Sequence, residues 1–327
     1  MRIHAVRGAT LMMSLALLSA ALLPAQQKPD ISVDVDLVTV ACSVTDHGVP
    51  VRGLKREDFE LRDNGQPREI ANFWQESDLP LSIAFIADVS GSQAGFIKNH
   101  REAVAQFFQQ VMSPRDRAMV VEVAQQSWLL SDLTDSAGAL SDAVERIGTR
   151  EGKQSPLLGP PCRNAGFPHS CGGTALWHGV YYAARQLKPV AGRKAIIILS
   201  DGMDTGSDIS LSNVIEMAQS AEVVVYSIKY ANPMRFLSLT ATIVQAVSRG
   251  MDRLSRETGG LTFPNPGRKI AEVFSEIESD LRNMYVLGFT PPSGVRDGMF
   301  HKLEVSTARP NLMVRSRAGY WARGNEK

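Results

Sequence analysis

The amino-acid sequence predicts an α/β protein in which a doubly wound, mostly parallel sheet is flanked by a small β unit. Two near-continuous apolar runs, residues 81–87 and 195–199, are typical of strands buried on both faces. Strand and helix patterns alternate through residues 79–290, which favours a parallel sheet with helices on both sides. Residues 26–78 and 291–327 carry strand patterns too small to be stable alone, so we expect them to pack together.

The N-terminus has the pattern of a secretory signal peptide. Arg2, His4 and Arg7 precede a short apolar core that ends near Ala25. Residues 1–25 are therefore expected to direct export to the periplasm, the cell surface or the medium, with an uncleaved anchor as the alternative. The rest of the chain has no apolar run of the roughly 18 residues that a membrane span requires, so we expect none in the mature protein.

The N-terminal β unit begins with an alternating segment, residues 31–44, whose apolar phase slips by one residue near Leu37. Such a slip predicts a bulge or a change of pairing partner. A strand within residues 54–63 and a second one over 66–74 are joined by Asn64-Gly65, a strong hairpin signal.

The central region then alternates between strand patterns and helix patterns, and the C-terminal tail has strand patterns again. We expect strands at 81–87, 117–123, 127–130, 195–199, 222–228 and 283–289, and helices at 94–111, 136–147, 174–187, 210–220, 243–258 and 268–282. The strand at 127–130 follows its predecessor closely enough to form an antiparallel edge, and the strand at 283–289 is expected to close the sheet. In the tail, 301–307 and 312–317 alternate like the two arms of a hairpin.

Polar oxygen-bearing side chains follow the two buried strands. Asp88, Ser90 and Ser92 come directly after the first apolar run, Asp201 follows the second, and Thr174 precedes an amphipathic helix. The carboxyl ends of parallel strands meet at the crevice where open α/β sheets bind ligands. Carboxylate and hydroxyl oxygens suit a hard cation such as Mg²⁺ or Mn²⁺. The alternative is a pair of helix N-caps at Ser90 and Thr174 with a solvated Asp201.

This order of Asp-x-Ser-x-Ser, a later Thr and a later Asp-Gly resembles the metal-ion-dependent adhesion site of von Willebrand factor A domains. The resemblance implies a Rossmann-like A domain with a complete site at Asp88, Ser90, Ser92, Thr174 and Asp201. It implies that the hydroxyls contact the metal and that the aspartates act mainly through bound waters. It also implies that the metal's open position accepts an acidic side chain of a protein partner. The strand segment, A-like domain and terminal Gly-Tyr hairpin together resemble exported von Willebrand A-related proteins of acidobacteria.

The three cysteines are interpreted in the light of export. Cys162 and Cys171 bracket a loop rich in Pro, Gly and Asn, and in an oxidising compartment we expect them to form a disulfide. A zinc site that uses these two cysteines with His169 and His178 is the alternative, although the spacing matches no common zinc pattern. Cys42 is expected to be a buried thiol.

Composition argues against several functions. The formal net charge is +1, from 35 basic and 34 acidic residues, which gives no case for nucleic-acid binding. Neither a phosphate-binding loop of the Gly-x-x-x-x-Gly-Lys type nor a His-Glu-x-x-His motif is present in the sequence. The resemblance to von Willebrand A domains implies a recognition site, so we expect a non-enzymatic protein that binds a protein partner through a metal ion. The alternatives are a metal-assisted hydrolase, for which no His or Glu is evidently placed as a base, and a structural component of the cell envelope.

Overall fold

The computed structural model describes residues 37–75, 79–149, 174–230, 241–264, 270–292 and 297–322, without the side chains of 241–248. Two expectations, the signal peptide at 1–25 and the disulfide between Cys162 and Cys171, lie outside these residues. No helix among the described residues is both long and apolar enough to cross a membrane.

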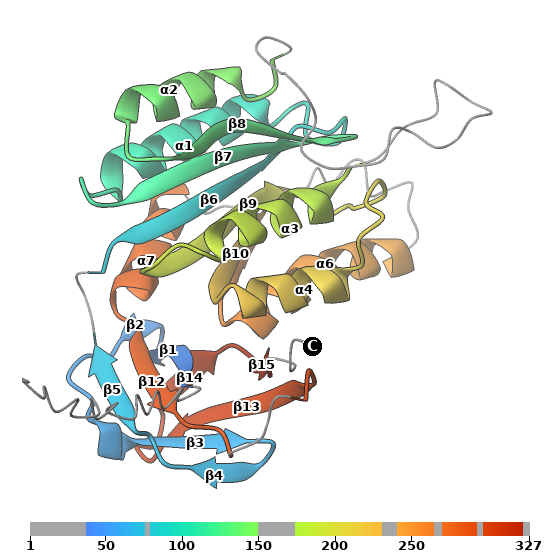
Figure 1. Cartoon of the computed structure of the whole chain (residues 1–327). Helices are drawn as coiled ribbons and strands as arrows, with labels where there is room; N and C mark the ends of the chain where they lie inside the picture. The colour runs from blue at the N-terminus through green and yellow to red at the C-terminus, as the bar shows by residue number, and fades with distance from the viewer. Residues whose placement is uncertain are drawn as a thin grey trace, which may run out of the picture. The chain divides into compact units, whose positions relative to one another are not determined.

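A six-stranded sheet forms the centre of the α/β body (Figure 1). Its order is β11-β10-β9-β6-β7-β8, and every pair is parallel except β7 with β8. The strands are β6 (Leu81–Asp88), β7 (Arg117–Val123), β8 (Ser127–Thr134), β9 (Arg193–Ser200), β10 (Val223–Lys229) and β11 (Thr262–Pro264). All eight residues of β6 are buried, as its unbroken apolar run predicts. The mostly parallel sheet is thus confirmed, with an antiparallel edge strand at β8.

Helices cover both faces of this sheet (Figure 1). They are α1 (Ile97–Gln110), α2 (Ala137–Arg146), α3 (Leu176–Leu187), α4 (Leu211–Ser220), α6 (Ala241–Thr258) and α7 (Ile270–Arg282). Strand β6 shows why two layers form. Its residues Ile83 and Phe85 belong to a core with α1, α2 and α7, whereas Ala84 and Ile86 belong to a second core with α3, α4 and α6. The sheet is therefore doubly wound.

The remaining strands build a β body from both ends of the chain. One sheet has the order β14-β1-β12-β5 with β2 paired to β1, and the other has the order β15-β13-β3-β4. The strands are β1 (Val38–Asp46), β2 (Val49–Pro50), β3 (Phe59–Asp63), β4 (Gln66–Arg68), β5 (Asn72–Gln75), β12 (Tyr285–Phe289), β13 (Phe300–Thr307), β14 (Met313–Ser316) and β15 (Gly319–Trp321), with a 3-10 turn η1 (Arg56–Asp58) before β3. Its core includes Val40, Leu61, Tyr285 and Leu303, together with the free thiol of Cys42.

The expected strand at 283–289 does not close the parallel sheet. As β12 it lies between β1 and β5 and pairs antiparallel with both. Tyr285 explains this placement, because its ring is buried in the β body and its hydroxyl donates to Val51 O at 2.9 Å and accepts from Leu54 N at 3.1 Å. The boundary of the α/β body therefore falls before Tyr285 rather than at residue 290.

The Asn64-Gly65 hairpin is confirmed between β3 and β4, but its second strand is shorter than expected. The segment 66–74 is divided into β4, which pairs with β3, and β5, which pairs with β12, and Ile70 between them is buried in the β core. In the tail, β14 pairs with β1 and not with β13, whose partners are β3 and β15. The tail thus contributes strands to both sheets of the β body instead of forming one hairpin.

Candidate functional site

The candidate site lies where β6 and β9 end. The two strands are parallel neighbours, with Ala87 opposite Leu199, so the residues that follow them meet at one edge of the sheet. Asp88, the last residue of β6, is fully buried. Its Oδ2 accepts a hydrogen bond from Ser200 Oγ at 2.5 Å, and its Oδ1 accepts one from Ser90 N at 2.9 Å. The Asp88 carboxylate is therefore fixed from both strand ends.

The hydroxyl groups of the site open onto a surface hollow. Ser90 Oγ and Ser92 Oγ lie 3.0 Å apart, within hydrogen-bond distance of each other. These two serines and Thr174 line a hollow of ≈ 620 Å³, whose rim includes Trp128 and Met203. Three of the five predicted residues therefore share one solvent-accessible space.

Thr174 is held by the loop that follows Asp201. Its carbonyl oxygen accepts from Thr205 N at 3.1 Å and from Gly206 N at 3.0 Å, and its own N–H donates to Thr205 Oγ1 at 3.2 Å. A Cβ on Gly206 would lie 3.3 Å from the Thr174 carbonyl carbon, so a glycine permits this close approach. The loop and Thr174 consequently form one unit.

The same loop supplies the N-terminal caps of α3. Asp204 Oδ1 accepts from Trp177 N at 3.1 Å, and Ser207 Oγ accepts from His178 N at 3.2 Å. These are first-turn N–H groups, which have no partner inside the helix. Capping from a distant loop fastens the chain after Asp201 to the helix that follows Thr174.

Asp201 is the second carboxylate of the predicted set, and neither it nor Asp88 is among the residues that line the hollow. Its side chain is buried, and its Oδ1 accepts from Met203 N at 3.0 Å. Burial raises the pKa of Asp88 to about 6, against the hydrogen bonds from Ser200 and Ser90, and the negative charge of Asp201 raises it further. Among the described residues, neither carboxylate has a Lys, Arg or His within 4.0 Å. Two neighbouring buried carboxylates without a cation favour the binding of one.

The donor set fits a hard divalent cation. It consists of two carboxylates and three hydroxyls, all oxygen, as Mg²⁺ and Mn²⁺ prefer. In the described part of the chain, no group of three or more His, Cys, Asp or Glu side chains is arranged to hold a metal ion, so the hydroxyls would have to supply the remaining ligands.

Two features of this region escape sequence reasoning. Ser200, which fixes Asp88, stands beside Asp201 in the sequence, and its position at a strand end is the signal that could have identified it. His178 Nε2 is hydrogen-bonded to Asp208 Oδ1, although the sequence suggests no acidic partner for any histidine. These two residues are 30 positions apart, so only the folded chain brings them together. The other members of the alternative zinc site lie outside the described residues.

Comparisons with known proteins give structural similarities only. No family model and no curated protein sequence matches the chain. Similar solved structures include von Willebrand A domains. BatB from Bacteroides thetaiotaomicron has 13% identity and a TM-score of 0.43, and the match covers 60% of this chain and 97% of that one. The SpRpn10 VWA domain has 16% identity and a TM-score of 0.36, covering 60% and 93%.

A third similar structure is proximal thread matrix protein 1 from the mussel byssus, described with a zinc-occupied MIDAS motif. It has 13% identity and a TM-score of 0.44, and the match covers 67% of this chain and 49% of that protein. Identities and TM-scores this low establish neither a family nor a function, so the proposals below rest on the geometry of the site.

Proposed function

We propose that this chain is an exported, non-enzymatic protein that captures an acidic side chain of a protein partner through Mg²⁺ or Mn²⁺. Asp88, Ser90, Ser92, Thr174 and Asp201 would hold the ion. The proposal depends on two neighbouring buried carboxylates, Asp88 and Asp201, that have no Lys, Arg or His partner among the described residues, together with the hollow that Ser90, Ser92 and Thr174 line. The proposed export rests on the sequence pattern of residues 1–25.

The charges of the site favour recognition of an anion. Two carboxylates roughly neutralise a dication, and hydroxyl ligands add no further negative charge. A bound ion would therefore supply a positive centre that accepts one more anionic oxygen from the hollow. A partner's Asp or Glu carboxylate meets this requirement.

The chain's own residues account for the selectivity of such a site. Ser200 holds the Asp88 carboxylate in place, and the loop from Thr205 to Ser207 holds Thr174. Trp128, Met203 and two glutamines, Gln125 and Gln126, surround the opening and would contact the partner. Aromatic and methionine side chains are enriched at protein–protein interfaces.

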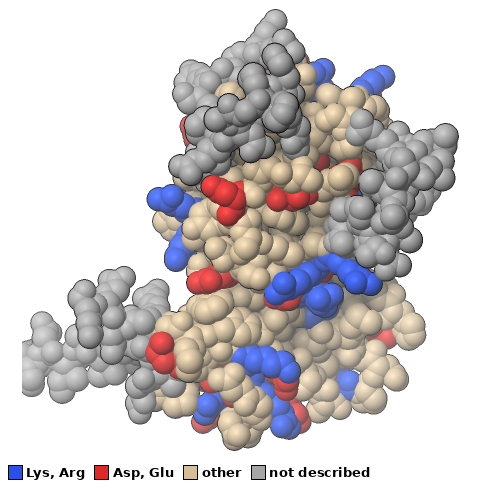
Figure 2. All heavy atoms as spheres, turned by 90° about the vertical axis from the view of Figure 1, so that its right-hand side faces the viewer, with Lys and Arg blue, Asp and Glu red and all other residues tan. Residues whose placement is uncertain are grey.

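Two rival functions receive less support. No described residue that lines the hollow is a His, Asp, Glu or Lys, so this space offers no general base for a metal-assisted hydrolase. On the face shown in Figure 2, basic and acidic side chains are interspersed over a mostly uncharged surface, which gives no support there for nucleic-acid binding.

The metal proposal is tested by titrating Mg²⁺ and Mn²⁺ into the full chain and into Asp88→Ala by calorimetry. We expect one saturable site in the wild type and no measurable binding in Asp88→Ala, because that substitution removes one of the two carboxylates. Asp142→Ala, an exposed acidic residue on α2, is the matched control and should bind as the wild type does. Equal affinity in Asp88→Ala and wild type would refute the site.

Partner capture is tested by pulldown from extracellular and envelope fractions, in Mg²⁺ and in chelator. We expect a partner that is retained only in Mg²⁺ and lost with Thr174→Ala, a change at the edge of the hollow that leaves both carboxylates in place. Metal binding without any metal-dependent partner would support a purely structural role for the ion instead.

A further inference from the structure

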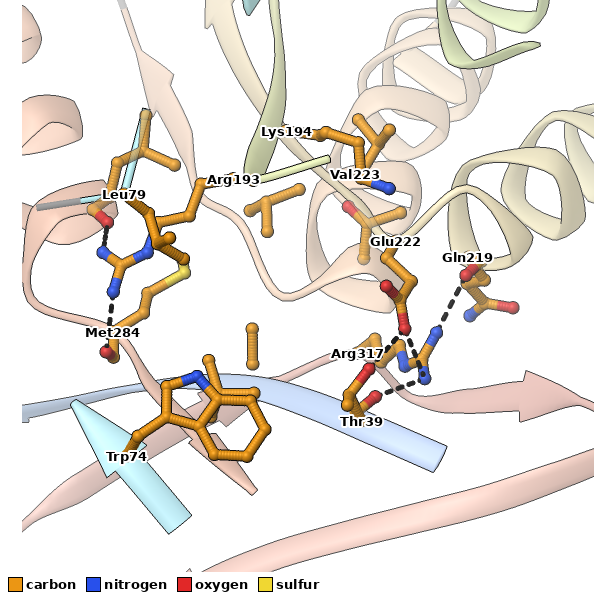
Figure 3. Close-up of a pocket in the computed structure, with 16 residues that line it drawn as sticks. Thr39, Trp74, Leu79, Arg193, Lys194, Gln219, Glu222, Val223, Met284 and Arg317 are labelled. Carbon is orange, nitrogen blue, oxygen red and sulfur yellow. Dashed lines mark hydrogen bonds and ion pairs between the residues drawn. The ribbon is translucent and has the colours of Figure 1, made fainter. Parts of the chain in front are cut away.

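A second cavity lies at the opposite end of the parallel sheet from the candidate site. It is a cavity of ≈ 320 Å³ between the first residues of β9 and β10 and the strands of the β body (Figure 3). Lys194 and Val223 reach it from the α/β body, and Thr39 and Trp74 reach it from the β body. The proposed metal site uses none of these residues.

Much of the cavity wall is apolar. Trp74 faces Lys194 across the space in Figure 3. The other apolar lining residues are Ala41, Leu79, Val223, Val224, Leu281, Met284 and Val286. Pockets for small organic ligands have this composition, mostly apolar with a few placed polar groups.

A network of hydrogen bonds and one ion pair around Arg317 closes one end of the cavity. Its guanidinium donates to Gln219 O at 2.8 Å and to Thr39 O at 2.6 Å, and it lies 3.7 Å from Glu222 Oε1. Thr39 Oγ1 donates to the same Glu222 oxygen at 2.6 Å. Glu222 has φ 55, a left-handed conformation that favours glycine, so its carboxylate is presented here despite backbone strain.

Arg193 closes the other end of the cavity (Figure 3). Its guanidinium donates to Leu281 O, and to Met284 O at 3.1 Å, at the C-terminal end of α7. The partial negative charge of a helix C-terminus favours a cation at this position. Arg193 is therefore compensated by α7.

Lys194 is the cation that remains. Its side chain is half-buried on the cavity wall, and it has no ion pair within 4.0 Å among the described residues. The negative charge of Glu222 acts on Lys194, but Glu222 is already paired with Arg317. Burial lowers the pKa of Lys194, and Glu222 only partly opposes this shift. Three cations and one carboxylate line the cavity. Arg317 is paired with Glu222 and Arg193 with carbonyl oxygens at the end of α7, so among the described residues Lys194 is the lining cation whose charge is not compensated.

We propose that this cavity binds a small organic monoanion, a carboxylate with an apolar body, whose charged end lies at Lys194 and whose body lies against Trp74 and Met284. One negative charge matches the single uncompensated cation. A phosphate monoester, which carries between one and two negative charges near neutral pH, would exceed it. The apolar wall would bury the body of the ligand. This site is independent of the metal proposed at Asp88.

The test is calorimetric titration of the full chain with octanoate, alongside octan-1-ol and acetate. All titrations are made in chelator, so that a carboxylate cannot bind through a metal ion at the other end of the sheet. We expect one saturable octanoate site, with octan-1-ol at least about tenfold weaker because it lacks the charge and acetate weaker still because it lacks the body.

Variants locate the site. Lys194→Met keeps most of the stem and removes the charge, and should weaken octanoate binding about tenfold or more. Lys188→Met, an exposed lysine after α3, is the control and should bind as the wild type does. Val286→Phe, which fills the cavity from β12 beside Trp74, should abolish binding without changing the metal affinity.

Three results would overturn the proposal: no saturable octanoate binding, octan-1-ol binding as tightly as octanoate, or wild-type affinity in Lys194→Met. Asp88→Ala separates the two sites. It should bind octanoate normally, so failure of the metal site would leave this inference intact.

Discussion

A buried aspartate lies at each end of strand β6, and the two are held in opposite ways. Asp88 is the last residue of β6, whereas Asp116 directly precedes β7 and accepts a hydrogen bond from the first residue of β6. At the carboxyl end, Asp88 accepts hydrogen bonds from Ser200 and Ser90 and has no cationic partner among the described residues. At the amino end, Asp116 accepts from Leu81 N, Ser113 N and Arg282 Nη2, each at 2.8 Å. Both carboxyl groups are almost fully buried.

The pKa values move in opposite directions as a result. Burial raises the pKa of Asp88 to about 6 because its hydrogen bonds do not compensate. Burial also acts to raise the pKa of Asp116, but the two backbone N–H groups and Arg282 outweigh it, and the pKa falls below the ordinary value. The comparison indicates that Asp116 has its partners within the fold, whereas the proposed metal ion would supply the cation that Asp88 lacks among the described residues.

Asp116→Asn should have the largest effect on stability. The substitution removes the buried counter-charge of Arg282, which keeps only its ion pair with the partly exposed Glu278, so we expect the free energy of unfolding at pH 7 to fall by about 3 kcal/mol. The depressed pKa means that this stabilisation is present above the unfolded-state pKa, about 3.9, and is lost as the pH falls through the lower folded-state value. Urea unfolding from pH 2 to pH 7 measures both effects. Asp142→Asn is the exposed control, and a loss as small as the control's would contradict the assignment of Asp116.

Asp88→Asn tests the comparison directly, because the effect on the free energy of unfolding should have the opposite sign to that of Asp116→Asn. Without metal, it removes a buried charge that has no Lys, Arg or His partner among the described residues. The amide oxygen can still accept from Ser90 N, and the amide NH2 can donate to Ser200 Oγ. We expect the free energy of unfolding in chelator to rise by about 1 kcal/mol, because an unpaired charge is costly to bury. A loss of more than about 1 kcal/mol would place both aspartates in the same structural role.

Glu222 should show the smallest effect. Its side chain is half-exposed, so the ion pair with Arg317 contributes at most about 1 kcal/mol. Glu222→Gly removes this contact but also relieves the strain of the left-handed backbone, which costs about 1 kcal/mol. The two effects oppose each other, so we expect the free energy of unfolding to change by less than about 0.5 kcal/mol. Glu222→Ala gains no such relief and should be about 1 kcal/mol less stable than Glu222→Gly. Equal stabilities in thermal unfolding would contradict the role of backbone strain here.

Much of the α/β body could be predicted from sequence because its signals are local. The strand predicted at 117–123 has the observed bounds, and the helix predicted at 136–147 is found within one residue at each end. Continuous apolar runs and a 3.6-residue period act within a few neighbouring residues, and the spacing of Asp88, Ser90 and Ser92 is equally local.

The β body could not be predicted as well because strand pairing is not local. An apolar segment such as Tyr285–Phe289 has the same pattern whichever sheet receives it, and its partners β1 and β5 lie near the other end of the chain. The same limit applies at the site. Nothing in the sequence joins His178 to Asp208, since the two residues meet only after folding.

The topology also suggests the order in which the two bodies fold. The α/β body is continuous in sequence, from Leu81 to Arg282, and its two connections lead into β5 and β12, which are hydrogen-bonded neighbours with Gln75 opposite Tyr285. Closing a loop of that length in an unfolded chain costs entropy. Once the parallel sheet has formed, the ends of β5 and β12 are already near each other, and most of that entropy has been lost. The β body is therefore expected to assemble second, on a template that the α/β body provides.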